Sequence, residues 1–319
     1  MRAYIVSRLI QFIPVIIGVT FLVFSTTLLL PGDPVTALLG LSAGQATFTP
    51  EQIERYRHDL GLDRPIPVQY GKWLGRAVQG DFGDSIKTRR PVTTEVVPRL
   101  KVTAQLGVTA FIISILIGLP LGIAAAVFRN TPIDRLITVV AVAAVAVPSF
   151  WLGIMMILFF SVKLQWLPPS GFVSPFEEPI RGLKLLIMPA VILGWSGAAV
   201  VTRQTRSAML EVLNQDYIRT ARAKGLAERS VVWVHALKNA MLPIVTVLGL
   251  SIGTLLGGAV IVETIFAIPG IGRLLVGSIN TKDFPVIQMI VLVIALTTVA
   301  ASLITDLAYG LLDPRIRFR

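Results

Sequence analysis

Six long stretches of this sequence contain no Asp, Glu, Lys or Arg, and they constrain the fold more than any other feature. A helix needs roughly 20 apolar residues to cross a bilayer, and each stretch reaches or approaches that length. Because a spanning segment must satisfy its own backbone hydrogen bonds, these stretches predict helices. The predicted spans are residues 9–30, 102–128, 136–162, 185–202, 239–262 and 284–305.

The composition excludes a soluble globule. Of the 319 residues, 54% are hydrophobic and 15% are charged, whereas an ordinary soluble domain is about 25% charged. A globule of this length has too little interior to bury so many apolar side chains. The absence of cysteine also excludes a disulfide framework and a thiolate metal site. The expected fold is therefore all-α and integral to a membrane.

Basic residues indicate the orientation of the spans. An even number of spans places both termini on one side, and seven of the Lys and Arg residues lie in the loop 203–238 on that same side. Since Lys and Arg are enriched in cytoplasmic loops, both termini are predicted to be cytoplasmic. The first span follows Arg2 and Arg8 but is longer than the apolar core of a signal peptide, so we expect it to remain as an anchor.

The predicted organisation has three parts. Residues 1–30 form the cytoplasmic end and first transmembrane helix, residues 31–101 form an extracytoplasmic helical segment, and residues 102–319 form a five-helix core with the loop 203–238. The external segment is predicted to contain helices near 49–61 and 68–79. The second helix carries Tyr70, Trp73, Leu74 and Ala77 on one face. This face fits a packing cap over the spans and a docking surface equally well.

The cytoplasmic loop contains a predicted short helix that ends at a glycine. Asp216 is a suitable N-cap, Arg222 and Lys224 complement the negative end of the helix dipole, and Gly225 fits the left-handed position after the last turn. Ala221 and Ala223 would keep part of the helix surface low enough for another protein to approach. On the residues alone, topology is the preferred explanation for the basic character of this loop.

Several kinds of membrane enzyme and transporter are disfavoured. The two histidines, His58 and His235, lie outside the spans, so a histidine-based intramembrane protease or metal site is not expected. No phosphate-binding loop is present, and no ionisable residue lies within a span to carry protons. Glu263, Asp283 and Asp306 lie just beyond span ends, where solvated positions are expected.

The fifth span contains small and polar residues on a helix. Gly253 and Gly257 have the spacing that permits close helix contact, and Thr246, Ser251 and Thr254 are polar. This combination indicates a helix that packs against protein or lines a path, rather than one that faces lipid on all sides.

Short motifs recur along nearly the whole chain. They are Pro31-Gly-Asp-Pro34, Leu60-Gly-Leu-Asp63, Pro67-Val-Gln-Tyr70, Gly80-Asp-Phe-Gly83, Val147-Pro-Ser-Phe-Trp-Leu-Gly153, Asp216-Tyr-Ile-Arg-Thr-Ala-Arg-Ala-Lys-Gly225, His235-Ala-Leu-Lys-Asn-Ala240, Leu242-Pro243, Val262-Glu-Thr-Ile-Phe266, Pro269-Gly-Ile-Gly-Arg273 and Leu312-Asp-Pro-Arg-Ile-Arg317. In number, order and spacing they resemble the permease subunits of bacterial ATP-binding-cassette importers, in the dipeptide, oligopeptide and nickel branch.

The resemblance implies a type I importer permease in the bacterial cytoplasmic (inner) membrane, which is a transport subunit and not an enzyme. Its implied partners are a second, different permease chain, two ATPase subunits or one fused ATPase, and an extracytoplasmic substrate-binding protein. ATP and Mg²⁺ would bind to the ATPases, and no cofactor, metal or nucleic acid to this chain. Alternating access would carry dipeptides or oligopeptides. The alternatives are a nickel chelate or haem as substrate, or an ATP-independent channel or membrane scaffold.

The resemblance also assigns site residues, none of them catalytic. The family carries a cytoplasmic Glu-Ala-Ala motif followed by glycine and Leu-Pro, for which Ala221, Gly225 and Pro243 are similar and Arg219 replaces the glutamate. The predicted coupling segment comprises Asp216, Tyr217, Arg219, Thr220, Ala221, Arg222, Ala223, Lys224, Gly225, Leu226 and Glu228. The candidates for the translocation path or outer gate are Thr246, Ser251, Thr254, Glu263, Pro269, Gly270 and Arg273.

Overall fold

A computed structural model of the chain describes residues 2–29, 51, 54, 55, 58 and 63–312, and all named elements within those residues are helices. The long ones are α1 (Arg2–Leu29), α5 (Val92–Val127), α8 (Pro179–Leu213), α11 (Leu237–Ile265) and α13 (Phe284–Leu312). The shorter ones are α4 (Ile66–Val78), α6 (Pro132–Ala146), α7 (Ser149–Met156), α9 (Asp216–Ala223), α10 (Glu228–Ser230) and α12 (Ile271–Asn280), with π-helical segments η1 (Ile157–Lys163) and η2 (Val231–Ala236).

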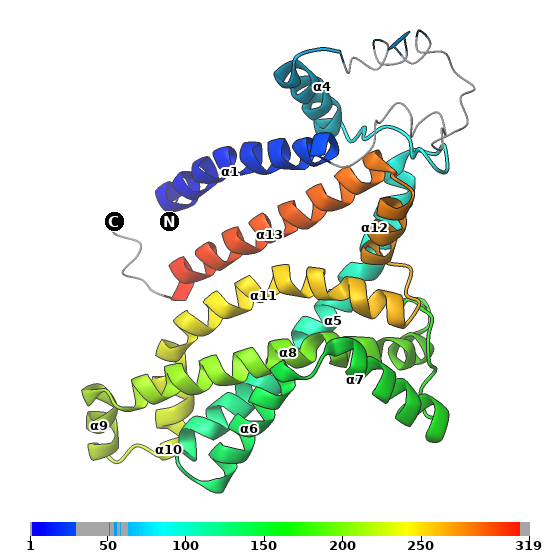
Figure 1. Cartoon of the computed structure of the whole chain (residues 1–319). Helices are drawn as coiled ribbons and strands as arrows, with labels where there is room; N and C mark the ends of the chain where they lie inside the picture. Colours follow the sequence, from blue (N-terminus) through cyan, green and yellow to red (C-terminus); the bar gives the residue numbers. More distant parts are fainter. Residues whose placement is uncertain (1, 30–50, 52–53, 56–57, 59–62, 313–319) are drawn as a thin grey trace.

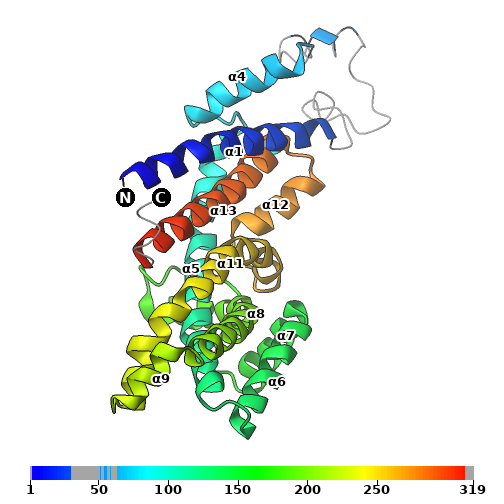
Figure 2. The same ribbon diagram turned by 90° about the vertical axis from the view of Figure 1, so that its left-hand side faces the viewer.

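The long helices form a stack (Figures 1 and 2). Helix α1 lies against α13, α13 against α11, and α11 against α8, while α5 crosses behind and packs along α8. The start of α1 and the end of α13 lie at the same end of the molecule as α9, on the left of Figure 1, and α12 lies at the opposite end.

Glycines allow α5 and α8 to approach closely. A Cβ atom at Gly122 would lie 2.5 Å from Thr205 Cβ, and one at Gly194 would lie 2.6 Å from the carbonyl oxygen of Ala110. Only residues without a side chain fit such contacts, which are typical of helix pairs in membranes. These positions therefore fix how α5 and α8 cross.

Among the residues that the structure describes, four helices are long and apolar enough to cross a membrane, or five if the bent α6–α7 pair counts as one span. The four contain the predicted spans 185–202, 239–262 and 284–305, and all but the last residue of 102–128. Helix α1 contributes a shorter apolar helical segment, Ile10–Ser25. The all-α fold is as predicted, and the count of six spans stays a prediction.

The predicted continuous helix over residues 136–162 is wrong. The chain bends by 101° between α6 and the α7–η1 helix. Val147, at the end of α6, is extended, with φ −76° and ψ 123°. Pro148 follows it, and the ring of a proline disfavours the helical conformation in the preceding residue. The proline therefore converts one apolar stretch into two helices.

The predicted helix at 68–79 is confirmed as α4, and the predicted helix near 49–61 lies outside the described residues. The apolar face of α4 packs on α1: the Trp73 and Phe24 ring centres are 5.9 Å apart. The hydroxyls of Tyr70 and Thr20 share a hydrogen bond of 2.8 Å. This face is therefore a packing surface, which agrees with the first of the two interpretations of the sequence.

A second contact attaches the segment before α5 to the core. The Asp283 carboxylate accepts hydrogen bonds from Ser85 Oγ at 2.5 Å and from the Ile86 amide at 3.0 Å. Asp283 is 2% exposed, so the expectation of a solvated interface position is wrong for this residue. The carboxylate is buried because the turn at 85–88 supplies donors for it.

Candidate functional site

The predicted cytoplasmic helix is α9, which lies at one end of the molecule beside α10 (Figure 1). It begins at Asp216, so the N-cap is Gln215 and not Asp216 as expected from the sequence. Gly225 has a φ of +75°, which confirms the left-handed position after the helix. The amide of Gly225 donates to the carbonyl of Arg222 at 2.9 Å, which closes the last turn.

An ion pair connects α9 to the segment after it. The Arg222 guanidinium donates to both carboxylate oxygens of Glu228, at 3.1 and 2.7 Å. This hydrogen bonding raises the pKa of Arg222 above its ordinary value. The pair bridges the turn at Gly225 and so sets the angle between α9 and α10. The sequence indicated Arg222 as a partner of the helix dipole and did not reveal this contact.

One face of α9 packs inward. Ile218 and Ala221 are buried against a cluster that includes Met209 and Val231. The expectation that Ala221 lies on a low outer surface is therefore wrong, because it shares the inner face with Ile218. Ten of the predicted coupling residues are exposed: Asp216, Tyr217, Arg219, Thr220, Arg222, Ala223, Lys224, Gly225, Leu226 and Glu228.

Tyr217 is fixed at this exposed surface. Its hydroxyl accepts a hydrogen bond of 2.7 Å from the Asn239 side chain at the start of α11, and its side chain is 43% exposed. This contact connects α9 to a spanning helix. Helix α9 therefore contacts α11 through Tyr217 and Asn239, and α8 through the buried cluster.

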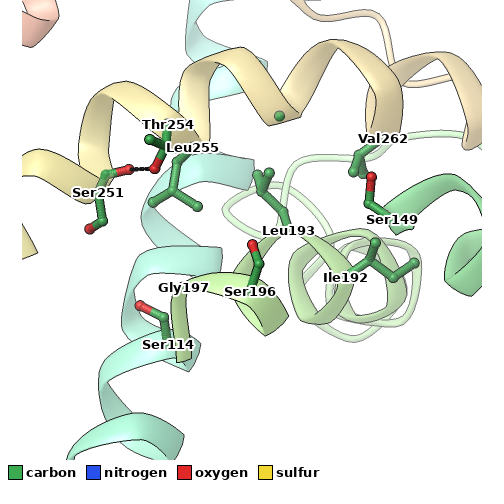
Figure 3. A pocket seen from close by; sticks show the side chains of 11 residues that line it. Ser114, Ser149, Ile192, Leu193, Ser196, Gly197, Ser251, Thr254, Leu255 and Val262 are labelled. Carbon is green, nitrogen blue, oxygen red and sulfur yellow. Dashed lines mark hydrogen bonds between the residues drawn. The ribbon is translucent and has the colours of Figure 1, made fainter. Parts of the chain in front are cut away.

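Two of the predicted path residues line a pocket of about 100 Å³ (Figure 3). Ser251 and Thr254 of α11 lie there with Ser114 of α5, Ser149 of α7 and Ser196 of α8. The remaining lining residues are small or apolar: Ile192, Leu193, Gly197, Leu255, Gly258 and Val262. The pocket thus presents five hydroxyl groups and no charged side chain.

The other path candidates lie away from this pocket. Thr246 forms hydrogen bonds with Tyr309 of α13 and, at 3.2 Å, with the carbonyl of Leu242. It therefore contributes to the contact between α11 and α13. Pro269 lies in the turn between α11 and α12, beside Gly270 and Arg273.

Glu263 is the buried centre of that turn, with 0% exposure. Its carboxylate accepts hydrogen bonds from Thr103 Oγ1 at 2.5 Å and from the Arg273 amide at 2.9 Å. Thr103 in turn accepts a hydrogen bond of 2.9 Å from the Ile271 amide. The expected solvated position of Glu263 is wrong, because main-chain and hydroxyl donors replace water around it. The side chain joins α5, α11 and α12.

A buried ion pair that sequence analysis did not predict joins α6 to α8. Arg206 donates to the two carboxylate oxygens of Asp134 at 2.6 and 2.8 Å. The Asn130 amide also donates to Asp134, at 3.0 Å. The Asp134 side chain is 5% exposed and the Arg206 side chain 31% exposed. The two residues are 72 positions apart, and in the sequence Arg206 is one of several basic residues of the predicted loop 203–238.

The part of the chain that the structure describes contains no group of three or more His, Asp or Glu side chains that could hold a metal ion. The hydroxyl pocket and the exposed surface of α9 are two places where the geometry offers a function.

Known proteins resemble this chain over its whole length. The dipeptide transport system permease protein DppB of Escherichia coli (strain K12) is 42% identical over 342 residues, which cover 100% of both chains. A putative peptide transport system permease protein of Brucella abortus (strain 2308) is 43% identical over 318 residues, again with 100% coverage of both. The di/tripeptide transport system permease protein DppB of Pseudomonas aeruginosa (strain UCBPP-PA14) is 41% identical, with 99% coverage of both.

Solved structures share the fold. A structure of the MetNI methionine ABC transporter in an inward-facing conformation matches 67% of this chain and 95% of its own, with a TM-score of 0.54 and 20% identity. An amino acid ABC transporter matches 67% of this chain and 92% of its own, with a TM-score of 0.51 and 17% identity. The predicted fold class, an all-α importer permease, is thereby confirmed.

Two family profiles cover most of the sequence. Residues 118–318 match the binding-protein-dependent transport system inner membrane component, and residues 1–107 match the N-terminal part of the membrane component of such systems. The chain is a multi-pass transport subunit and not an enzyme. It belongs to the family of inner membrane components of binding-protein-dependent transport systems.

Proposed function

We propose that this chain is one of two different permease subunits of a peptide importer, and that the two together form a path for dipeptides or oligopeptides by alternating access. The similarity to three peptide permeases over 99–100% of the chain carries the proposal. The hydroxyl pocket supports it, because a peptide needs hydrogen-bonding groups along its route. Rigid-body movement of helices would open the path on one side at a time.

Energy enters from the partners. As an importer permease, the chain works with an ATPase and a substrate-binding protein. We assign ATP and Mg²⁺ to the ATPases, since the sequence has no phosphate-binding loop. The exposed side chains of α9 are the proposed docking surface for an ATPase, and the contacts of Tyr217 and Ile218 would pass its movement to the spanning helices.

The orientation belongs to the same proposal. Both termini and the loop 203–238 are cytoplasmic, and the segment 31–101 lies outside, where the binding protein delivers substrate. The start of α1, the end of α13 and helix α9 lie at the same end of the molecule, which supports this arrangement. The basic residues of the loop support it as well. The segment 31–101 then lies on the outer side of the core, and the turn after Glu263 lies near the outer end of α11.

The decisive experiment is ATP hydrolysis by the reconstituted complex in the presence of the binding protein. Dipeptides, longer peptides, a nickel chelate and haem are compared as stimulants. Stimulation by peptides alone supports the proposal. If only the nickel chelate or haem stimulates hydrolysis, the chain is still an importer permease but peptide is not its substrate. If the chain does not copurify with an ATPase, a channel or scaffold is supported instead.

A proline variant tests the docking surface. Gly225→Pro is incompatible with the φ of +75° and removes the amide that donates to Arg222. We expect it to reduce ATPase copurification at least tenfold. The matched control is Gly80→Pro, because Gly80 ends α4 with a φ of +80° and an amide that donates to Ala77. An equal loss in both variants would mean that general misfolding, not docking, is responsible.

A further inference from the structure

The hydroxyl pocket is built from four separate elements that converge from distant parts of the sequence. Ser114 is buried on α5, Ser149 is half-buried at the start of α7, and Ser196 of α8 and Thr254 of α11 are exposed at the pocket surface. Figure 3 shows the five hydroxyl-bearing side chains around one space. Because Ser196 and Thr254 are exposed, a molecule outside the chain can reach the pocket.

Three of the hydroxyls already use their protons. Ser114 donates to the carbonyl of Phe111 at 2.7 Å, and Ser251 donates to the carbonyl of Leu248 at 2.7 Å. Thr254 donates to the carbonyl of Ser251 at 2.8 Å. A hydroxyl has one proton and two lone pairs. Once the proton is committed to the main chain, the oxygen can only accept a further hydrogen bond.

The pocket therefore favours donors among its ligands. Toward a ligand, three of its five hydroxyl groups can only accept a hydrogen bond, and the hydroxyls of Ser149 and Ser196 can accept or donate. A carboxylate offers only acceptors and would find few protons here, and no cationic side chain lines the pocket to bind it. A main-chain amide offers one N–H group and carries no net charge, so it suits a pocket without charged residues.

We propose that this pocket is a station on the translocation path that accepts hydrogen bonds from the amide N–H groups of a peptide. This inference rests on the proposed peptide transport and assigns one step of substrate recognition to Ser114, Ser251 and Thr254. Because the pocket contains no charged group, it recognises the peptide backbone and does not select among side chains by charge.

The size of the pocket fits a station rather than a site for a whole substrate. A volume of about 100 Å³ has room for about three water molecules, at roughly 30 Å³ for each in the liquid. One peptide unit can replace some of these waters. The competing occupant is an apolar side chain of the second permease, but it would bury three acceptor oxygens without donors, which is unfavourable.

The first test compares two substrates that differ in one N–H group. Diglycine has an amide proton, and glycylsarcosine carries a methyl group in its place. Uptake of each is measured in proteoliposomes that contain the complete complex and its binding protein. For the double variant Ser251→Ala/Thr254→Val, we expect diglycine uptake to fall about fivefold to tenfold and glycylsarcosine uptake to change less than twofold. The same binding protein is used with the unaltered chain and with the double variant, so its own preference for one substrate affects both in the same way.

Thr109→Val is the matched control. Thr109 lies on α5, is half-buried and donates to the carbonyl four residues before it, at 2.7 Å, but it does not line the pocket. We expect the ratio of diglycine uptake to glycylsarcosine uptake to be the same in Thr109→Val as in the unaltered chain. Equal losses of both substrates in the double variant, or a reduced yield of the second permease on purification, would overturn the inference in favour of a packing role.

The second test needs no loss of function. Because the chain contains no cysteine, Ser196→Cys provides a single thiol at the pocket surface, and its labelling by a small maleimide is followed on this chain. We expect diglycine, with the binding protein and ATP, to slow the labelling at least threefold, and glycylsarcosine to slow it less. If the unaltered complex imports peptides but neither substrate protects the thiol, the inference fails while the proposed function stands. If the unaltered complex imports no peptide, both fail.

Discussion

The carboxylate of Glu263 occupies the space that a side chain at residue 270 would need. A Cβ atom at Gly270 would lie 2.1 Å from one carboxylate oxygen of Glu263. The φ of Gly270 is −97°, so the backbone itself would accept alanine. Steric conflict with Glu263, and not backbone strain, is therefore what requires glycine here.

This conflict predicts coupling between two substitutions. Gly270→Ala should destabilise the complex by about 2 kcal/mol through overpacking. Glu263→Ala should also destabilise it, because the Thr103 hydroxyl and the Arg273 amide lose their acceptor. The double variant should be more stable than the sum of the two effects predicts, since removal of the carboxylate makes room for the methyl group. Thermal denaturation of the purified complex measures all three, and strict additivity would contradict the argument.

The Asp134–Arg206 pair gives a second prediction at this scale. Asp134→Ala or Arg206→Ala alone leaves one charge in a largely buried place and should cost about 2–3 kcal/mol. Replacement of both by apolar residues, Asp134→Leu/Arg206→Met, should recover at least half of the larger loss. The exposed pair Arg181–Glu178, with 67% and 54% exposed side chains, is the control. Its single variants should change the denaturation midpoint little.

Local sequence predicted some residues and missed others for a physical reason. Gly225 was predictable because a left-handed residue after a helix is a local requirement. Glu263, Asp283 and Asp134 were not, since each carboxylate is satisfied by donors from segments that are distant in the sequence. For Glu263 and Asp283 the position near a span end indicated solvation, and only the tertiary contacts reveal that these side chains are buried.

At the scale of elements, helix contacts follow small residues, but the register of a contact is not evident from spacing alone. Gly253 and Gly257 had the spacing for close contact. A Cβ at Gly253 would meet Thr298 of α13 at 3.3 Å, whereas one at Gly257 would meet nothing within 4 Å. The closer contact is one turn earlier, where Gly249 faces Thr305. The sequence shows which helix can pack closely, and the partner helix determines where.

The α5–α8 crossing predicts the effect of one methyl group. Gly122→Ala would place a Cβ 2.7 Å from the carbonyl oxygen of Thr202, and backbone atoms cannot yield easily. We expect a loss of about 2 kcal/mol and a lower yield of the complex. Gly107→Ala on the same helix meets nothing within 4 Å and should be neutral or slightly stabilising. Denaturation midpoints of the two variants provide the comparison, and a loss of the same size at Gly107 would contradict it.

At the scale of the whole molecule, hydropathy predicted the helical class and the location of the apolar segments, because the bilayer imposes both. It did not predict the 101° bend between α6 and α7, because the length of a stretch without charged residues does not show whether the helix is straight or bent. The pocket was also beyond sequence analysis: Ser251 and Thr254 were candidates, but Ser114, Ser149 and Ser196 come from three other helices.

The orientation of the whole molecule yields the final prediction. Lys224 lies after α9, at the end of the molecule that contains the start of α1, and Lys72 lies on α4, in the segment that is predicted to be external. Both side chains are exposed, and the chain has no cysteine of its own. Lys224→Cys and Lys72→Cys therefore supply single thiols that a membrane-impermeant maleimide can report.

In right-side-out vesicles, the reagent should label Lys72→Cys and leave Lys224→Cys unmodified until detergent opens the membrane. In inside-out vesicles the order should reverse. Assembly with the ATPase should then protect Lys224→Cys, because the thiol lies at the proposed docking surface, and should leave Lys72→Cys unaffected. Labelling of both thiols from the same side would refute the orientation, since α4 and α9 would then lie on one side of the membrane. Labelling of Lys224→Cys from the cytoplasmic side without protection would retain the orientation and reject docking at this position.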